Sequence, residues 1–487
     1  MELKEILEKV TVLEAINFKE KVEVSAIAFD SRKVKEDTLF IAQRGVHVDG
    51  HDYIAKAIAL GANVIVCEEL PKEILASVVY IVVKNADKTL ALVAANFYRH
   101  PSEKLKLVGV TGTNGKTTVA SLLCQLFQLL GCKTGLLSTV KIKVGAKEYP
   151  ATHTTPDSLT INKYLAEMVA NGVTYCFMEV SSHGIHQSRT YALDFDGGVF
   201  TNLTHDHLDY HKTFGEYRDV KKVFFDELGK QAFALTNLDD KNGSFMLQNS
   251  KASKKSYAQK TLADYRVKIV EKSFLGMLLV VNNQEVWVQL VGGFNASNLA
   301  AIYGVASELG VEEEELLIAL SQLKSVDGRF QYQVSSTGIV SVVDYAHTPD
   351  ALKNILSTIR DIVQLETNII TVVGCGGDRD KTKRPKMAAI AMEFSDQVIL
   401  TSDNPRTEDP MCILEDMEAG VAEEVVSRAL SILDRKQAIK TACKLAKKGD
   451  VVLVAGKGHE TYQEINGERT HFDDKEILIE TFQILKK

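Results

Sequence analysis

Residues 105–118 read Leu-Lys-Leu-Val-Gly-Val-Thr-Gly-Thr-Asn-Gly-Lys-Thr-Thr, an apolar run followed by a glycine-rich turn. The run predicts a buried strand over 105–110, and the apolar pattern after the turn predicts a helix over 117–130 that stops at Gly131. Glycines let successive backbone N–H groups curl round a phosphate, and the N-terminus of the following helix adds positive potential. This stretch therefore predicts a parallel α/β sheet with a phosphate site at the end of one strand.

The chemistry of the turn narrows the ligand to ATP. Lys116 is placed to reach the β- and γ-phosphates, and the Thr117 hydroxyl can ligate Mg²⁺. Val110 stands where the common form of the motif has its first glycine, but the strand–turn–helix context argues against a plain glycine turn with an exposed lysine. The predicted ATP contacts of this turn are Gly112, Thr113, Asn114, Gly115, Lys116, Thr117 and Thr118.

The same alternation of short β-branched runs and helical patterns extends over most of the 487 residues. It predicts an α/β fold with parallel sheets covered by helices. At about 100–200 residues per domain the chain is too long for one core. Breaks near His100-Pro101 and near 327–330 predict three α/β domains, at 1–100, 101–330 and 331–487.

In the third domain, four predicted strands are each followed at once by polar or glycine residues. Ligands bind at the carboxyl ends of strands in open parallel sheets, so these four loops predict one shared crevice. The strands are expected at 339–343, 369–373, 397–401 and 451–455.

Composition excludes several classes of partner. The chain has 57 Lys+Arg against 64 Asp+Glu, a net charge of -7, and no basic stripe, so neither nucleic acid nor an anionic membrane is expected. No stretch of about 18 apolar residues and no signal peptide appear. Seven scattered cysteines without a Cys-x-x-Cys pair indicate reduced thiols in the cytoplasm. We expect small-molecule substrates.

A second group of residues indicates a further divalent cation. Glu179 ends a predicted buried strand, and His207 lies in Thr-His-Asp-His-Leu-Asp at 204–209. A carboxylate and an imidazole can share a Mg²⁺ ion, although a hydrogen-bonded loop histidine is the alternative for His207. The spacing fits no common zinc pattern. The surrounding cluster consists of His205, Asp206, Asp209 and His211.

Eight motifs, in this order, resemble the Mur ligase family of peptidoglycan-precursor synthetases, and they cover nearly the whole chain. They lie at 111–118, 179–183, 202–207, 293–298, 328–330, 344–349, 403–406 and 456–460.

The resemblance implies an ATP-dependent amide ligase with a UDP-precursor-binding first domain, an ATP-binding second domain and an amino-acid-binding third domain. The expected reaction adds meso-diaminopimelate to the D-Glu side-chain carboxylate of UDP-MurNAc-L-Ala-D-Glu through an acyl phosphate. Phosphoryl transfer between anions needs charge neutralisation and in-line positioning, which two Mg²⁺ ions and Lys116 would supply. The resemblance also implies a monomer.

Lys221 matches the lysine that family members carry as a carbamate formed with CO₂, which binds magnesium. Without the resemblance, Lys221 would be interpreted as a solvated helix lysine. Lys222 follows directly, but points about 100° away on a helix. The implied metal ligands are Thr117, Glu179, His207 and the Lys221 carbamate.

The resemblance assigns further contacts. Asn295 and Asn298 match positions near adenine, and Arg329 and Asp344 match positions on the phosphates and ribose; from the residues alone, a helix cap for Asn295 and a surface ion pair for Arg329 stay open. For the UDP-precursor the matches are Ser31, Thr154, Thr155, Ser181, Gln187 and Arg189, which could otherwise belong to ordinary polar turns.

Arg406 bears on which amino acid is added. Members that take meso-diaminopimelate carry Asp-Asn-Pro-Arg, and here this motif spans 403–406. A guanidinium pairs bidentately with the second carboxylate of diaminopimelate and repels the ammonium end of lysine. The remaining matches are Arg379, Asp403, Asn404, Gly456 and Glu460.

Three alternatives stay open at this point. They are a lysine-adding Mur ligase, a ligase like the folylpolyglutamate synthetases, and a non-catalytic ATP-binding regulator. A folate enzyme should lack the extended first domain and should not need Asp-Asn-Pro-Arg, and a regulator should lack the second metal cluster and Lys221.

Overall fold

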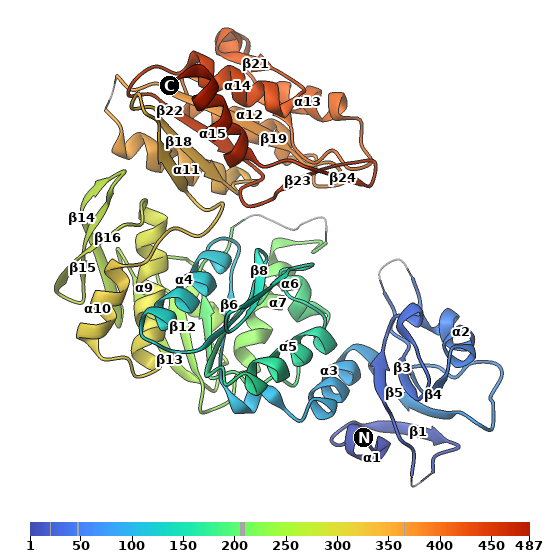
Figure 1. Ribbon diagram of the computed structural model, residues 1–487. Coiled ribbons are helices and arrows are strands. Elements are labelled where there is room, and N and C mark those ends of the chain that lie inside the picture. The colour runs from blue at the N-terminus through green and yellow to red at the C-terminus, as the bar shows by residue number, and fades with distance from the viewer. Residues whose placement is uncertain (20, 46–47, 205–209, 365) are drawn as a thin grey trace.

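The structure is a computed structural model that describes residues 1–19, 21–45, 48–204, 210–364 and 366–487. The described residues form three large sheets, each built from one continuous part of the chain, and a two-stranded ribbon. Figure 1 shows the three sheets as successive bodies, the first in blue, the middle in cyan to yellow and the third in orange to red. The α/β fold expected from the alternating pattern is confirmed.

The first sheet has the strand order β1-β5-β4-β3-β2, and only the β1–β5 pair is antiparallel. Its central strands are runs of buried β-branched residues, as both-sided burial requires. The strands are β1 (Val12–Ile16), β2 (Ala26–Ala28), β3 (Thr38–Ile41), β4 (Ala62–Cys67) and β5 (Val79–Val83). The helices are α1 (Leu3–Ile6), η1 (Ser31–Lys33), η2 (Gly50–Tyr53), α2 (Ile54–Ala59) and α3 (Ala86–Phe97).

The middle sheet has eleven strands in the order β16-β15-β14-β13-β12-β11-β6-β10-β7-β8-β9. Strand β6, which precedes the glycine-rich turn, lies between β10 and β11 in the parallel centre. Its strands are β6 (Lys106–Thr111), β7 (Thr134–Leu137), β8 (Lys141–Val144), β9 (Lys147–Pro150), β10 (Tyr175–Glu179), β11 (Gly197–Phe200), β12 (Phe233–Asn237), β13 (Ser253–Ala258), β14 (Tyr265–Ser273), β15 (Gly276–Val281) and β16 (Gln284–Val288).

The two edges of this sheet differ from the all-parallel expectation. β7–β8–β9 and β14–β15–β16 are antiparallel meanders. β8 and β16 alternate buried and more exposed side chains, because one face of each strand meets solvent. A search for continuous apolar runs therefore misses them.

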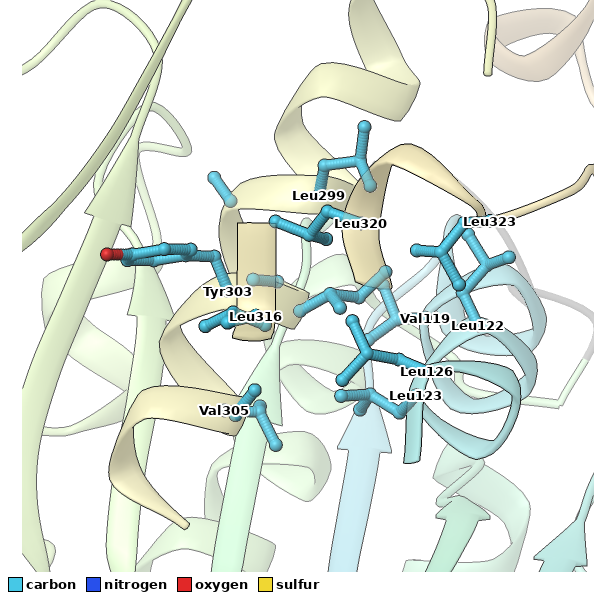
Figure 2. Packing of buried hydrophobic residues seen from close by; sticks show 14 of the residues in the cluster. Val119, Leu122, Leu123, Leu126, Leu299, Tyr303, Val305, Leu316, Leu320 and Leu323 are labelled. Atoms are coloured by element: carbon cyan, nitrogen blue, oxygen red, sulfur yellow. The ribbon is translucent and has the colours of Figure 1, made fainter. Parts of the chain in front are cut away.

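Helices cover both faces of the middle sheet. The helix after the turn packs on α9 and α10, and Figure 2 shows the interlocking side chains, among them Val119, Leu123, Leu299 and Leu320, all buried. This packing fixes the N-terminus of the helix at the end of β6. The helices are η3 (Pro101–Lys104), α4 (Lys116–Leu129), α5 (Ser158–Ala170), α6 (Ser182–His186), α7 (Phe214–Asp226), α8 (Gly243–Met246), α9 (Gly293–Glu308) and α10 (Glu313–Ser321).

The third sheet has the order β17-β18-β22-β19-β20-β21, with only the β17–β18 pair antiparallel. The four strands expected here are confirmed within one or two residues. They and their neighbours are β17 (Gln331–Val334), β18 (Val340–Asp344), β19 (Ile369–Cys375), β20 (Gln397–Ser402), β21 (Ala429–Ser431) and β22 (Val451–Ala455), with the ribbon β23 (Tyr462–Ile465) and β24 (Glu468–His471). The helices are α11 (Pro349–Ile362), α12 (Lys383–Phe394), α13 (Pro410–Glu418), η4 (Glu423–Arg428), α14 (Arg435–Leu445) and α15 (Asp474–Leu485).

Among the described helices, none has the length and apolar character needed to cross a membrane. All seven cysteines carry free thiols; Cys132 is half-buried, Cys412 is exposed and the others are buried.

Candidate active site

A cleft of about 660 Å³ separates the turn after β6 from the third sheet. The residues of the glycine-rich turn line one wall, and the loops after β18, β19, β20 and β22 line the other. The single crevice expected for the four loops of the third sheet is therefore confirmed, and the phosphate turn faces it. Expected residues that line this cleft are Thr113, Asn114, Gly115, Lys116, Thr117, Thr154, Glu179, Arg329, Arg379, Asp403, Asn404, Arg406, Gly456 and Glu460.

The glycine-rich turn adopts a conformation that side chains would prevent. Gly112 has φ +149° and Gly115 has φ +89°, and a Cβ on Gly112 would lie 1.9 Å from Thr201 Oγ1. Lys116 Nζ donates hydrogen bonds to the carbonyl oxygens of Gly112 at 3.0 Å and Thr113 at 2.9 Å. The lysine thus lies over the turn. A bound phosphate group would be a stronger, charged hydrogen-bond partner for its ammonium group than these two carbonyl oxygens.

Thr117 and Glu179 come together beside this turn. Thr117 Oγ1 donates a hydrogen bond to Glu179 Oε2 at 2.9 Å and accepts one from Arg329 Nη2 at 3.1 Å. Glu179 is fully buried at the end of β10, and its Oε1 accepts a hydrogen bond from the Thr139 backbone N–H at 2.7 Å. A hydroxyl and a buried carboxylate are hard oxygen ligands that fit Mg²⁺.

His207 lies outside the described residues, so its predicted part in a metal site stays a prediction. Within the described ranges, no group of three or more His, Cys, Asp or Glu side chains could hold a metal ion. A Mg²⁺ ion beside Thr117 and Glu179 would therefore take further ligands from phosphate oxygens and water, as Mg²⁺ commonly does in nucleotide sites.

Lys221 reaches the phosphate turn from α7. Its side chain is buried, Nζ donates a hydrogen bond to Gly112 O at 2.9 Å, and Nζ lies 4.7 Å from the centre of the Tyr217 ring. Lys222 turns away and pairs with Asp226 at 2.6 Å. The solvated position that the local pattern suggests for Lys221 is wrong, because α7 packs directly behind the turn.

A second, smaller pocket of about 130 Å³ adjoins the turn and is lined by Asn298, Arg329 and Asp344. Asn295 lies behind it and accepts a hydrogen bond from Asn298 Nδ2 at 3.1 Å. Arg329 stacks on the Tyr345 ring at 4.7 Å, and its buried Nε has no partner in the part of the chain that the structure describes. An orphaned guanidinium N–H needs an acceptor, which a nucleotide would supply.

Asp344 at the end of β18 accepts a hydrogen bond from the Phe330 backbone N–H at 2.7 Å. Burial raises the pKa of the Asp344 carboxyl to about 6, while the nearby Arg329 acts in the opposite direction. This carboxyl joins the linker from the middle sheet to the third sheet.

Four of the six residues expected to bind the UDP-precursor form one hydrogen-bonded cluster, and a fifth, Thr154, directly precedes Thr155 in the chain. Arg189 Nη1 donates to Thr155 O at 2.6 Å, and its Nε and Nη2 donate to Gln187 Oε1 at 3.0 and 2.6 Å. Thr155 Oγ1 accepts from the Ser181 N–H at 2.9 Å, and Thr154 lines the cleft. Burial lowers the pKa of Arg189.

The sixth, Ser31, is not part of this cluster. It is buried in η1 beside the first sheet and is absent from the described residues that line the cleft. The residue before η1, Asp30, caps its N-terminus: the Asp30 carboxylate accepts a hydrogen bond from the Arg32 N–H at 3.0 Å.

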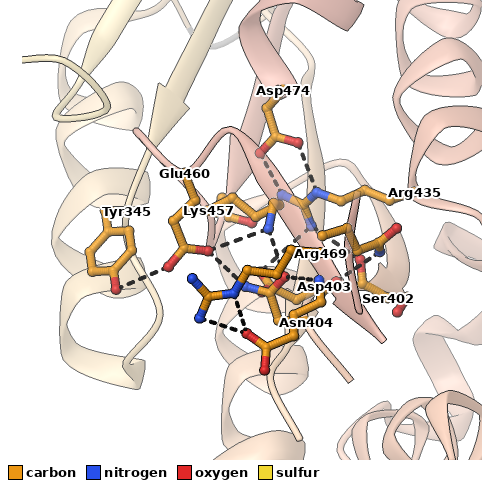
Figure 3. Close-up of polar contacts among 12 residues, drawn as sticks. Tyr345, Ser402, Asp403, Asn404, Arg435, Lys457, Glu460, Arg469 and Asp474 are labelled. Atoms are coloured by element: carbon orange, nitrogen blue, oxygen red, sulfur yellow. Dashed lines mark hydrogen bonds and ion pairs between the residues drawn. The ribbon is translucent and has the colours of Figure 1, made fainter. Parts of the chain in front are cut away.

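The loops after β20 and β22 interlock through a buried lysine, as Figure 3 shows. Asn404 Nδ2 donates to Glu460 Oε2 at 2.7 Å, and Lys457 Nζ donates to Asn404 Oδ1 at 3.0 Å and Glu460 Oε2 at 3.3 Å. Burial and the neighbouring Asp403 raise the pKa of Glu460. Sequence reasoning missed Lys457, although it lies inside the 456–460 motif.

Arg435 and Asp474 stabilise the strand ends from which these loops start, and sequence reasoning missed both. The guanidinium forms a bidentate pair with the carboxylate at 2.8 and 2.7 Å, and both side chains are fully buried. Arg435 Nη2 also donates to Ala455 O at 3.0 Å, at the end of β22. The charged pair in Figure 3 therefore ties α14 and α15 to the end of the strand that carries Gly456.

The two arginines expected to bind the amino acid both line the cleft. Arg406 Nη1 donates to Gly377 O at 2.7 Å, and Arg379 Nη1 donates to Asp378 O at 2.9 Å. Gly456 has φ +118°, and a Cβ there would lie 2.5 Å from Asp403 Oδ2.

Family models match three parts of the chain. They are the "Mur ligase family, catalytic domain" at residues 23–98, the "Mur ligase middle domain" at 110–306 and the "Mur ligase, glutamate ligase domain" at 328–458.

Proteins named UDP-N-acetylmuramoyl-L-alanyl-D-glutamate–2,6-diaminopimelate ligase are similar over the full length. The chain is 53% identical to that of Cytophaga hutchinsonii over 100% of both chains. It is 55% identical to that of Parabacteroides distasonis over 95% of each. A solved structure of a ligase with this name matches with a TM-score of 0.70 and 32% identity, over 100% of this chain and 99% of the other. The chain belongs to the Mur ligase family.

Proposed function

We propose that the protein is an ATP-dependent, ADP-forming ligase that joins meso-diaminopimelate to the D-Glu side-chain carboxylate of UDP-MurNAc-L-Ala-D-Glu in peptidoglycan precursor synthesis. The observation that carries this proposal is one cleft with the phosphate turn on one wall and Arg406 on the other. The names of the full-length relatives support the same reaction.

The three sheets would divide the work between domains at 1–100, 101–330 and 331–487. The first would bind the UDP part of the precursor through Ser31, and the Arg189 cluster of the middle domain would bind its peptide part. The middle domain would bind ATP, and the third would bind the incoming amino acid. This division would place the reacting carboxylate and the amine in the cleft between the second and third sheets.

Phosphoryl transfer would take place at the turn after β6. The backbone N–H groups of 112–117 and Lys116 would hold the phosphates of ATP in line with the D-Glu carboxylate. Thr117 and Glu179 would hold a Mg²⁺ ion, which supplies charge neutralisation when it is bound. The amine of the amino acid would then attack the carbonyl carbon of the resulting acyl phosphate. The new C–N bond would form as the C–O bond to phosphate breaks, so that inorganic phosphate leaves and the amine gives up a proton.

A carbamate on Lys221 is part of the proposal. Carbamate formation with CO₂ needs an unprotonated amine, and the Lys221 side chain supplies an amine that is buried beside the phosphate turn, with Nζ 2.9 Å from Gly112 O. The product would place two oxygens next to Gly112, where they could join His207 and Glu179 around a second Mg²⁺ ion.

The amino acid would be recognised mainly by charge. Arg406 and Arg379 would pair with carboxylates, and Glu460, with Asp403 beside it, would hold an ammonium group. Lysine lacks the second carboxylate, so it would leave one guanidinium unpaired in the cleft.

We further propose that the protein works as a monomer in the cytoplasm on small molecules alone. Free thiols at all seven cysteines and the ATP requirement support that compartment.

Phosphate release tests the proposed function. The purified protein is given UDP-MurNAc-L-Ala-D-Glu, ATP and Mg²⁺ with either meso-diaminopimelate or L-lysine. We expect phosphate release and tripeptide product with meso-diaminopimelate and far less with L-lysine. Preference for lysine would contradict the specificity assigned to Arg406, and no release with either would contradict the ligase activity.

A further inference from the structure

Arg379 and Arg406 follow neighbouring strands of the third sheet. β19 and β20 are parallel partners, with Cys375 opposite Ser402, so the turns that follow them emerge side by side. We call residues 376–379 and 404–408 the arginine turns, since each carries one of the two arginines in the cleft. Under the proposed function, on which the inference rests, both arginines bind the amino acid.

The backbones of the arginine turns touch each other directly. Gly377 N–H donates to Asn404 O at 2.9 Å, and Arg406 Nη1 returns a hydrogen bond to Gly377 O at 2.7 Å. A Cβ on Gly377 would lie 1.9 Å from Pro405 O, so only glycine permits this approach. The distance between the two turns is therefore set by contacts that involve the Gly377 backbone.

Both turns contain a left-handed residue that is not glycine. Asp378 and Arg406 each have φ +54°, a conformation that costs free energy and persists only where neighbours enforce it. The Asp378 carboxylate accepts hydrogen bonds from Thr407 N–H at 3.2 Å and Thr407 Oγ1 at 2.8 Å. The Asp378 side chain thus binds Thr407, the residue that directly follows Arg406.

Glu408 connects the arginine turns to a buried cation. Its Oε1 accepts from the Asp378 N–H at 2.6 Å and from Arg384 Nη2 at 2.9 Å, and its Oε2 accepts from Arg384 Nη1 at 3.1 Å. Arg384 is fully buried on α12 and also pairs with Asp416 at 2.8 Å. The guanidinium lowers the pKa of Glu408 to about 2, so this carboxylate stays charged at neutral pH.

We propose that Thr407, Glu408 and Arg384 are positioning residues that set the distance between Arg379 and Arg406 and so make the site select an amino acid with two carboxylates. None of these three is among the described residues that line the cleft. Their effect on the amino acid would pass through the arginine turns. An amino acid with one carboxylate would gain nothing from the fixed spacing.

Thr407→Val gives the sharpest test, because it removes the hydroxyl bond to Asp378 and keeps the side-chain shape. Thr407 is exposed, so the fold tolerates the change. We expect the KM for meso-diaminopimelate to rise about five- to twentyfold, less than the full effect of a hydrogen bond to a charged group, because the Thr407 N–H bond to Asp378 remains. The ratio of kcat/KM for meso-diaminopimelate over L-lysine should fall by a similar factor, with the KM for ATP unchanged. Thr407→Ser keeps the hydroxyl and should restore both values.

Glu408→Gln is the second variant, and it should lower the same ratio further because the Arg384 pair is weakened. Thr261→Val is the matched control: Thr261 is also exposed, and its Oγ1 donates to Asp239 Oδ1 at 2.9 Å far from the arginine turns. We expect wild-type constants for it.

Two results would overturn this inference and leave the proposed function intact. One is an unchanged KM and an unchanged ratio in both variants, and the other is an equal rise of the KM for meso-diaminopimelate and for ATP. A wild-type protein without activity on meso-diaminopimelate would contradict the proposed function, and this inference with it. The two failures are therefore distinguishable before any variant is measured.

Discussion

Lys221 Nζ donates a hydrogen bond to the carbonyl oxygen of Gly112 at 2.9 Å, across 109 residues of sequence. The next residue, Lys222, instead pairs with Asp226 one helical turn further along α7. Two adjacent lysines thus have different environments, one behind the phosphate turn and one in a local ion pair. The pair offers a matched comparison.

Lys221→Ala should abolish nearly all ligase activity, since it removes the amine that carbamate formation needs. Lys222→Ala should leave kcat within about threefold, because Lys222 pairs with Asp226 and makes no bond to the phosphate turn among the described contacts. Phosphate release with all three substrates measures both. Full activity of Lys221→Ala would remove this lysine from the mechanism.

The carbamate itself is open to a separate measurement. Wild-type protein depleted of CO₂ should lose activity and regain it when bicarbonate is added, whereas Lys221→Ala should not respond. Intact mass spectrometry under mild conditions should find one CO₂ adduct on wild-type protein only. Activity independent of bicarbonate, without an adduct, would argue for an unmodified lysine.

Arg406→Lys should raise the KM for meso-diaminopimelate about ten- to hundredfold, because an ammonium keeps the charge but loses the bidentate fork. The KM for ATP should stay within a factor of about two. Arg266→Lys, at an exposed position in β14, is the control and should behave as wild type. Equal losses for ATP and the amino acid would count against the assigned role.

Asp474→Asn should lower stability by about 3–5 kcal/mol, because it removes the bidentate charge partner of the buried Arg435 guanidinium and leaves only the longer ion pair to Asp403 at 3.9 Å. Burial opposes, and Asp474 favours, the charged form of Arg435, and the net effect is a raised pKa. Thermal or urea unfolding measures the change. Glu480→Gln breaks the exposed Lys436–Glu480 pair on the same two helices and should change stability by less than about 1 kcal/mol. Similar losses of stability in the two variants would contradict the view that burial makes the Arg435–Asp474 pair the more costly one to break.

Asp344→Asn should make the protein more stable at neutral pH and weaken ATP binding. The folded pKa of Asp344 is about 6, above the ordinary 3.8, so between these values the folded state binds more protons than the unfolded state. Wild-type stability then falls as pH rises through this window, and the loss persists above it. Asparagine does not titrate, so the gain of the variant should be small near pH 4 and largest above about pH 6.5.

Unfolding midpoints without nucleotide, at about pH 4.5 and about pH 7.5, measure this trend. Asp327→Asn, an exposed carboxylate in the same linker, is the control. A gain of the same size at both pH values would show that the effect comes from something other than ionisation.

Helices, strands and turns that are determined by residues close together in the sequence could be predicted from the sequence. Apolar runs such as 105–110 and 369–373 indicated the parallel strands, and Gly112 and Gly115 indicated the phosphate turn, because period and turn chemistry are local properties. The four loops of the third sheet could be assigned to one crevice since parallel strands end at one edge. The antiparallel meanders were missed, and for strands such as β8 and β16 the reason is that half-exposed strands lack continuous apolar runs.

The burial of charged residues, and the choice of their partners, came from the packing of distant segments. Lys221, Arg384, Arg435 and Lys457 look like surface residues in the sequence, yet each is buried against a partner from another element. Arg435 and Asp474 are 39 residues apart, on separate helices. Burying a charge is favourable only where topology delivers a partner, and no local pattern specifies which distant side chain that will be.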